Sequence, residues 1–250
     1  MLKIIQVGHD DASDRYIRNK IKAVEAAGMQ AEVINLDDDS TTRDLVSAIE
    51  FVAGDKETSA IIVQLPLPRH IDKDIVLRQI PIEYDIDGLN PKSPYKPLTP
   101  CAIMRWLDES GVNVEGKNVA ILGRSELVGK PLAEMMIERG ATVSVMNSKT
   151  TQATKQIICG NADIIVSATG MIGAVSHSEV LFPRDGLIVI DVGINRNEEG
   201  KLCGDVSEGA RRLLDTYGCV CTPVPGGVGK WTVRELVLRL AEMEGRNVEA

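Results

Sequence analysis

Two side chains of chemically useful type stand four positions apart near the start of the chain. Tyr16 and Lys20 fall within residues 13–27, whose apolar pattern predicts a helix that stops at Gly28. Residues four apart lie on one helical face, so a phenol and an ammonium would project together and could bind and polarise a substrate. Taken alone, the spacing favours an ordinary surface pair.

Polar side chains also stand at the ends of apolar segments. Gln64 is the one polar residue of segment 63–68, which closes a predicted strand. Polar residues at the carboxyl ends of parallel strands face the binding crevice. Asp87 lies in segment 85–88, inside a proline-rich stretch over residues 80–100. Gln64 could equally be a hydrogen-bonded edge residue, and Asp side chains in turns often bond their own backbone.

A turn containing glycine, residues 123–129, follows a predicted strand and precedes a predicted helix. Dinucleotide-binding folds place their glycine-rich turn here, where backbone N–H groups and the helix dipole hold a pyrophosphate. The spacing is imperfect, because Ser125 takes the place of the second glycine and Gly129 comes one position late. A plain strand–helix turn stays open as the alternative, although the strand–turn–helix context favours a nucleotide.

The next strand ends in residues 147–150, which include no Asp or Glu. Dinucleotide folds that prefer NAD usually carry an acidic residue there for the ribose hydroxyls. Arg124, Ser148 and Lys149 could instead meet a 2′-phosphate, or the segment could be an ordinary polar turn. A second glycine-rich segment, residues 223–229, either lets backbone approach a ligand closely or is a flexible connection.

These residues have to be positioned by alternating strands and helices. The alternation predicts parallel sheets with right-handed crossovers. The sequence therefore predicts an α/β fold of two α/β domains with a cleft between them, the second a Rossmann-like dinucleotide-binding domain. The domains are expected over residues 1–99 plus 230–250 and over 100–229. Strands are predicted over residues 2–7, 31–36, 60–65, 118–122, 142–146, 163–168 and 187–192, and helices over 13–27, 41–52, 100–108, 129–139 and 232–243.

Composition narrows the class of protein. Hydrophobic residues make up 44% of the 250 residues and aromatic residues 3%, so the core must be aliphatic, which suits strands buried on both faces. A formal charge of -8 argues against nucleic acid as a partner. The five cysteines lack zinc-site spacing, and we expect them to be reduced in a cytoplasmic protein. The three histidines suggest no metal site, and the sequence shows neither a signal peptide nor a membrane-spanning run.

Five motifs occur along the chain in one order. They are the Tyr-x-x-x-Lys pair, Val-Gln-Leu-Pro-Leu-Pro at 63–68, Asp-Ile-Asp-Gly at 85–88, Gly-Arg-Ser-x-x-Val-Gly-x-Pro at 123–131 and Pro-Gly-Gly-Val-Gly at 225–229. In this order they resemble the bifunctional methylenetetrahydrofolate dehydrogenase/cyclohydrolase family. Segments 167–170, 191–195 and 204–206 are similar to the cofactor domain of that family. The resemblance covers nearly the whole chain, and the motifs are specific as an ordered set.

The resemblance implies two reactions on folate-bound one-carbon units. 5,10-Methylenetetrahydrofolate gives a hydride to NADP, or to NAD in some members, and water then opens the 5,10-methenyl cation to 10-formyltetrahydrofolate. Hydride loss mainly needs two aligned carbons, whereas water addition needs a group that moves protons. Members are usually homodimers formed through the cofactor domain.

The resemblance also implies roles for individual side chains. Lys20 is the central catalytic residue, with Gln64 bonded to it, Asp87 binds the pterin, and Tyr16 stacks on or positions the folate. The neutral amide of Gln64 can orient the amine without a charge that would keep it protonated. Further substrate contacts are implied for Leu65, Pro66, Pro225, Gly226 and Gly227. Cofactor contacts are implied for Gly123, Arg124, Ser125, Val128, Gly129, Ser148, Thr169, Gly170 and Ile194.

Four features depart from the family pattern. The sequence begins at the first predicted strand, so we expect it to lack the helix that usually precedes this strand in the family. Residues 97–100 read Pro-Leu-Thr-Pro in place of Pro-Cys-Thr-Pro, with Ala102 for a glycine, and Asn147 replaces a histidine. Lys230 and Trp231 stand where the family has Pro-Met. We expect these two between the glycine loop and the final helix, where they would tune the folate site.

Two other functions fit parts of the sequence. A shikimate-type NADP dehydrogenase shares the two-domain plan and also uses Lys and Asp, but it lacks segments like 63–68 and 225–229. A folate- or nucleotide-binding module without catalysis would explain residues 230 and 231. The joint presence of Tyr16, Lys20, Gln64 and Asp87 favours an active enzyme over such a module.

Overall fold

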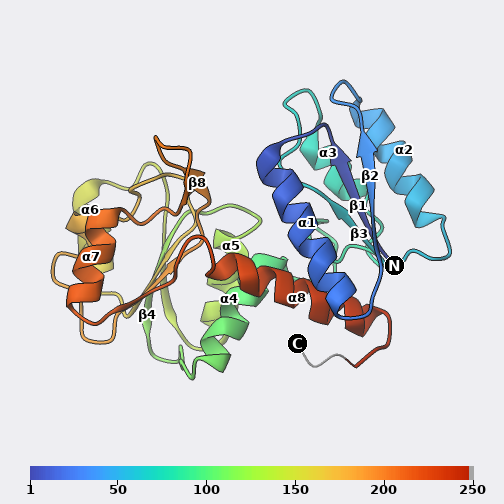
Figure 1. Ribbon diagram of the computed structural model, residues 1–250. Helices are drawn as coiled ribbons and strands as arrows, with labels where there is room; N and C mark the ends of the chain where they lie inside the picture. The colour runs from blue at the N-terminus through green and yellow to red at the C-terminus, as the bar shows by residue number, and fades with distance from the viewer. Residues whose placement is uncertain (248–250) are drawn as a thin grey trace. The chain divides into compact units, whose positions relative to one another are not determined.

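The computed structural model describes residues 1–247, which form two compact units (Figure 1). The first unit contains Met1–Leu98 and the chain from Val233 onward, and the second contains Thr99–Thr232. The chain passes from one unit to the other at the start of one helix and within another. Both points therefore fall in or next to a helix, without a loop to mark them.

The first unit is built on a three-stranded parallel sheet in the order β2-β1-β3. Aliphatic residues of β1 and β3 face both ways, so the sheet needs a helical cover on each side. Helices α1 and α8 cover one face, and α2 and α3 cover the other. The elements are β1 (Leu2–Val7), α1 (Asp11–Ala26), β2 (Ala31–Leu36), α2 (Thr42–Ala53), β3 (Ala60–Val63) and α3 (Lys73–Gln79).

The second unit is built on a five-stranded parallel sheet in the order β10-β7-β6-β4-β5. β5 pairs with one edge of β4 and β6 with the other, so the strand order reverses at β4, as in doubly wound nucleotide-binding folds. The elements are α4 (Leu98–Glu109), β4 (Asn118–Leu122), α5 (Gly129–Glu138), β5 (Thr142–Met146), α6 (Gln152–Gly160), β6 (Ile164–Ser167), the 3-10 helix η1 (His177–Glu179), β7 (Ile188–Asp191), β8 (Asn195–Arg196), β9 (Leu202–Cys203), α7 (Glu208–Thr216), β10 (Val220–Cys221) and α8 (Val228–Met243). Two parallel α/β units agree with the predicted fold class.

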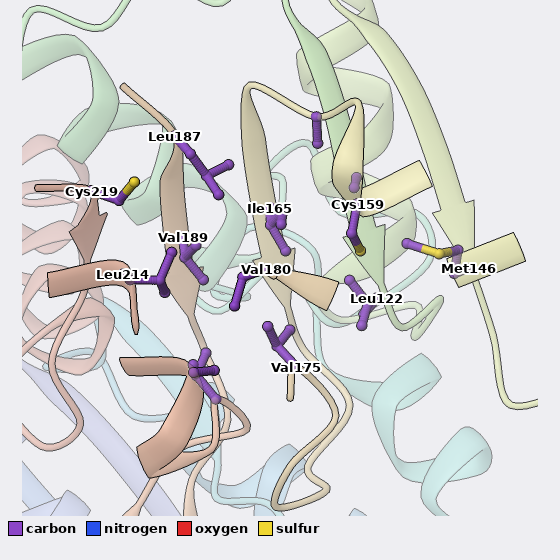
Figure 2. Packing of buried hydrophobic residues seen from close by; sticks show 14 residues of the cluster. Leu122, Met146, Cys159, Ile165, Val175, Val180, Leu187, Val189, Leu214 and Cys219 are labelled. Atoms are coloured by element: carbon purple, nitrogen blue, oxygen red, sulfur yellow. The ribbon is translucent and has the colours of Figure 1, made fainter. Parts of the chain in front are cut away.

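Aliphatic side chains fill both faces of the second sheet. Figure 2 shows one face, where Leu122, Ile165 and Val189 of the strands pack with Cys159 of α6 and Leu214 of α7. Helices α4 and α5 cover the opposite face. The core is aliphatic, as the composition requires. None of the helices in residues 1–247 is long and apolar enough to cross a membrane.

The final helix begins earlier than predicted. α8 starts at Val228 and not at residue 232, so Lys230 and Trp231 lie in its first turn and not in a connection before it. The glycines that suggested a loop belong partly to the helix, where the N–H of Lys230 donates to the carbonyl of Gly227 at 3.0 Å. The expectation that residues 230 and 231 lie between the glycine loop and the final helix was therefore wrong.

Three helices were not predicted: α3, α6 and α7. They are only seven to nine residues long, so each offers about two turns of sequence pattern. Each carries an N-cap that the sequence does contain. Asp72, Thr151 and Ser207 accept hydrogen bonds from the backbone N–H groups of Ile75, Thr154 and Ala210 respectively.

All five cysteines are free, and they differ in how strongly burial raises the pKa of the thiol. Burial raises the pKa of the Cys159 thiol to about 12 and that of Cys221 to about 11. At pH 8 roughly one thiol in a thousand or fewer would be thiolate, the nucleophilic form. We expect iodoacetamide to modify half-buried Cys203 well before Cys159 or Cys221, as mass spectrometry of peptides can measure. Equal rates in the folded protein would contradict this.

Candidate active site

A hydrogen bond between Lys20 and Gln64 joins α1 to the end of β3. Lys20 is 9% exposed, and its Nζ donates to Gln64 Oε1 at 3.2 Å. The amide nitrogen of Gln64 donates to the carbonyl of Leu65 at 2.6 Å, which can only accept. The orientation of the amide is thereby fixed, with its oxygen turned to the ammonium. In the described part of the chain, Lys20 forms no ion pair.

Tyr16 lies one helical turn before Lys20. Both residues belong to α1, so the predicted common face exists. Tyr16 is half-buried, and burial raises the pKa of its phenol. The ring is thus a neutral, partly exposed surface beside the ammonium. Leu65 is half-buried and Pro66 exposed in the turn after β3, and the peptide bond that joins them is cis.

Asp87 lies in a segment that extends the first sheet. The N–H of Ile61 in β3 donates to the carbonyl of Tyr84 at 2.7 Å, which draws residues 84 and 85 alongside the strand. Asp85 is fully buried and binds the N–H of Asn90 at 2.8 Å, so it closes the turn; burial raises the pKa of its carboxyl. Asp87 is half-buried and has no hydrogen bond or ion pair within residues 1–247. Of the two carboxylates, Asp87 is the one left for a ligand.

Arg239 of α8 holds the turn of Asp87, a contact that sequence reasoning missed. Its Nη1 donates to the carbonyls of Ile86 and Lys96, each at 2.9 Å, and its guanidinium lies 5.1 Å from the ring centre of Tyr95. The partners are more than 140 residues away in sequence, so no local pattern announces them. A signal was available in Glu235 and Arg239, two charged residues four apart on a mostly apolar helix face.

In the second unit, the loops after β4 and β6 touch. Leu122 pairs with Ser167, so the residues that follow them come side by side. Gly123 has φ +110, and a Cβ there would lie 2.4 Å from the carbonyl oxygen of Ala168. A Cβ on Gly129 would lie 2.1 Å from the carbonyl oxygen of Gly123. The turn therefore needs both glycines, at the point where the strand order reverses and doubly wound folds bind ligands.

The rim of this turn carries exposed polar and basic groups. Arg124 and Ser125 are exposed, and Ser125 Oγ accepts from the N–H of Val128 at 3.1 Å. The N–H of Gly123 donates to Met146 at the end of β5, next to the turn that carries Ser148 and Lys149. Ser148 and Lys149 are both exposed. Neither Arg124 nor Lys149 pairs with a carboxylate within the described chain. The rim suits a phosphate-bearing ligand.

Asn147, which stands where the family has histidine, shapes the same rim. Its Oδ1 accepts from the N–H of Lys149 at 2.8 Å, and its own N–H donates to Thr150 Oγ1 at 3.1 Å. Asparagine therefore serves here as a turn residue.

Other expected cofactor residues follow β6 and β7. Thr169 is half-buried, Gly170 is exposed, and Ile194 is 45% exposed. The N–H groups of Thr169 and Gly170 both donate to the buried carboxylate of Asp205, at 2.7 and 3.3 Å. These two N–H groups are consequently not free to bind a ligand.

Pro225, Gly226 and Gly227 lie in the second unit, whereas Tyr16, Lys20, Gln64 and Asp87 lie in the first. Gly226 is exposed with φ +106, and the Nζ of Lys230 lies 3.9 Å from where its Cβ would be. A Cβ on buried Gly227 would lie 2.4 Å from the carbonyl oxygen of Pro223, so this glycine serves the turn itself. Gly226 is the member that exposes bare backbone. The described residues contain no cluster of three His, Cys, Asp or Glu side chains that could hold a metal ion.

Comparison with known proteins gives matches over most of the chain. The family model described as the tetrahydrofolate dehydrogenase/cyclohydrolase catalytic domain matches residues 1–87, and the NAD(P)-binding domain of the same family matches 97–247. The bifunctional protein FolD of Lysinibacillus sphaericus is 38% identical over 96% of this chain and 85% of its own length.

Solved structures of the same family also match this chain. The bifunctional FolD methylenetetrahydrofolate dehydrogenase/cyclohydrolase of Campylobacter jejuni superposes with a TM-score of 0.88 at 36% identity, over 98% of this chain and 87% of that one. The Trypanosoma brucei enzyme, solved with NADP and an inhibitor, gives 0.86 at 33%, over 97% and 85%. Shikimate 5-dehydrogenase of Thermus thermophilus, at 16% identity and a TM-score of 0.60 over 100% and 95%, shares the fold alone. The chain belongs to the tetrahydrofolate dehydrogenase/cyclohydrolase family.

Proposed function

We propose that the chain oxidises 5,10-methylenetetrahydrofolate to the 5,10-methenyl form with NADP and hydrolyses that product to 10-formyltetrahydrofolate. Family membership over both halves of the chain supports the reaction class. The observation that carries the proposal is the part-buried Lys20–Gln64 hydrogen bond, which gives the first unit a group able to move protons. In this proposal residues 1–99 and 230–250 bind folate and 100–229 bind the cofactor.

The residues proposed to bind folate offer three kinds of contact: an aromatic ring, a carboxylate and apolar side chains. Tyr16 offers a neutral ring for the pterin or benzoyl group, and Asp87 offers a carboxylate that can accept N–H donors of the pterin. Leu65 and Pro66 add apolar contact after β3. The proposal also assigns substrate contacts to Pro225, Gly226 and Gly227. The catalytic residues in this proposal are Lys20, Gln64 and Asp87.

The residues of the second unit fit NADP. Gly123 and Gly129 keep side chains out of the turn after β4, which leaves backbone for a pyrophosphate. Arg124, Ser148 and Lys149 supply donors for a 2′-phosphate. We propose further contacts from Ser125, Val128, Thr169, Gly170 and Ile194. When bound, NADP supplies an acceptor for the hydride of the methylene carbon.

Lys20 serves the hydrolytic step in this proposal. Water that adds to the methenyl carbon must lose a proton, and the departing folate nitrogen must gain one. An ammonium or amine at Lys20 Nζ can hold and pass that proton. Gln64 fixes the position of Nζ through its oxygen, and as a neutral amide it adds no charge that would keep the lysine protonated.

The function is tested with four mixtures: methylene- and methenyl-tetrahydrofolate, each with NADP and with NAD. The proposal expects reduced cofactor to form from the methylene substrate, and 10-formyltetrahydrofolate to form from the methenyl substrate. NADP reduction with shikimate, and none with folate, would favour the shikimate-type dehydrogenase. Binding of a folate analogue without turnover of either substrate would favour a binding module.

Arg124→Ala tests the choice of cofactor. Arg124 is exposed and makes no ion pair within residues 1–247, so its guanidinium is available for a 2′-phosphate. A charge-assisted hydrogen bond contributes about 1.5–3 kcal/mol, so the KM for NADP should rise roughly tenfold or more, with the KM for NAD nearly unchanged. Lys130→Ala, which removes an exposed charge paired with Glu126, is the control.

Two results would contradict the assignment of Arg124. A higher kcat/KM with NAD than with NADP in the wild-type chain would show that the enzyme does not select for the 2′-phosphate. An equal rise in the KM of both cofactors would move Arg124 to the pyrophosphate.

We further propose that the enzyme is a homodimer in the cytoplasm. Large apolar side chains of the second unit are exposed, among them Met171, Ile172 and Phe182, which supports a protein partner. Five free cysteines are typical of a reducing compartment. Sedimentation equilibrium should give twice the mass of 27.1 kDa, and a monomer at micromolar concentration would contradict the dimer.

A further inference from the structure

One buried carboxylate joins the loops that follow β6 and β7. Asp205 is fully buried. Its Oδ2 accepts from the Thr169 N–H at 2.7 Å, the Thr169 hydroxyl at 2.8 Å and the Ser167 hydroxyl at 2.9 Å. The N–H of Gly170 donates to the same oxygen at 3.3 Å, and Oδ1 accepts from Asn195 Nδ2 at 3.0 Å. The donors belong to two separate segments, the end of β6 with the loop after it and the start of β8, so a single side chain fixes both.

A second buried carboxylate fixes Asp205 itself. Asp191 ends β7, and its two oxygens accept from the N–H of Asp205 at 2.8 Å and of Val206 at 3.0 Å. The guanidinium of Arg211 pairs with the same carboxylate. Burial raises the pKa of Asp191, while these N–H groups and Arg211 act in the opposite direction. Asp191 thus holds two consecutive N–H groups of the backbone that carries Asp205.

The two segments interlock through their glycines. A Cβ on Gly193 would lie 1.9 Å from Asp205 Oδ1, and a Cβ on Gly204 would lie 1.9 Å from Asp191 Oδ2. Each carboxylate therefore lies against the glycine of the other segment, and no other residue type leaves room for it. This explains why segments 191–195 and 204–206 both combine Asp with Gly.

We propose that Asp205, held by Asp191, is a positioning residue for the cofactor. It sets the backbone of Thr169, Gly170 and Asn195 before the cofactor arrives, which lowers the ordering cost of binding. The proposal rests on the proposed function, since it takes NADP as the ligand. Because Asp205 engages the N–H groups of Thr169 and Gly170, these residues contact NADP through their carbonyls and backbone surface.

The test compares three variants of the full chain. Asp205→Ala removes the acceptor, and Asp205→Asn keeps one acceptor oxygen. Asp163→Ala removes a carboxylate that accepts from the Asn118 N–H at the start of β4. Calorimetric titration with NADP gives Kd, and amide exchange of the ligand-free protein reports residues 168–171. We expect Asp205→Ala to raise Kd at least tenfold and to speed exchange there. Asp205→Asn should do both to a smaller degree, and Asp163→Ala neither.

Each outcome decides the proposal. Wild-type Kd and exchange in Asp205→Ala would overturn it. So would an equal loss of NADP affinity in Asp163→Ala at a matched loss of melting temperature, because the effect would then be general. If Asp205→Ala does not fold, unchanged exchange and Kd in Asp205→Asn overturn it. A wild-type chain that does not bind NADP would refute the proposed cofactor, while exchange at 168–171 would still show whether Asp205 fixes the loop.

Discussion

Lys20→Ala is expected to abolish the hydrolysis of 5,10-methenyltetrahydrofolate while the chain stays folded. Proton transfer by a positioned group contributes typically about 10²–10⁴-fold to a rate, so kcat should fall by roughly that factor. Oxidation of the methylene substrate should fall less, because hydride loss needs alignment and no acid or base. Measuring both activities on one preparation separates these effects.

Lys22→Ala is the matched control for this experiment. Lys22 lies on the same helix two residues further, and it is exposed. It should keep both activities, and both variants should keep the circular dichroism of the wild type. The lost hydrogen bond to Gln64 costs roughly 0.5–3 kcal/mol, less than the roughly 5–15 kcal/mol that stabilises a typical folded protein. Hydrolysis by Lys20→Ala at the wild-type rate would remove Lys20 from the mechanism.

Sequence pattern located most strands of the fold and both units. Strands β1, β2, β4 and β5 have the predicted ends, because each is an apolar run bounded by turn residues. The prediction failed for α3, α6 and α7, which are only seven to nine residues long, although their N-caps were present in the sequence. It also failed at the start of α8, where Gly229 looked like a loop residue and is helical. Glycines in a sequence therefore do not by themselves predict a loop, because a helix can form through them when their backbone groups find helical hydrogen-bond partners.

For the site, sequence could name residue types and not their partners. The Lys20–Gln64 hydrogen bond followed from the family resemblance, since 44 residues separate the two in the chain. Arg239 and Asp205 gave no such signal. Both act on backbone atoms of distant segments, and such contacts depend on sheet order and register, which a single sequence does not specify. The motifs around Asp191 and Asp205 were visible in the sequence. The contacts of Gly193 with Asp205 and of Gly204 with Asp191 depend on how the two segments meet in the fold.

The turn after β4 gives the second large expected effect. Gly129→Ala would place a Cβ 2.1 Å from the carbonyl oxygen of Gly123 and 3.0 Å from Cα of Arg124. Both neighbours are backbone, so no side chain can move aside, and the turn itself has to open. Overpacking of this kind costs about 1–3 kcal/mol. The N–H groups that face a pyrophosphate would shift with it, so the Kd for NADP should rise more than tenfold.

Gly209→Ala is the control that isolates steric crowding. Gly209 lies inside α7 with nothing within 4 Å of its would-be Cβ, so alanine there should stabilise the chain by roughly 0.5–1 kcal/mol. Thermal unfolding and NADP titration of both variants give the comparison. Hydrolysis of methenyl substrate without NADP should survive in Gly129→Ala, because Lys20 and Gln64 belong to the other unit. If Gly129→Ala binds NADP like the wild type, the turn after β4 does not hold the pyrophosphate.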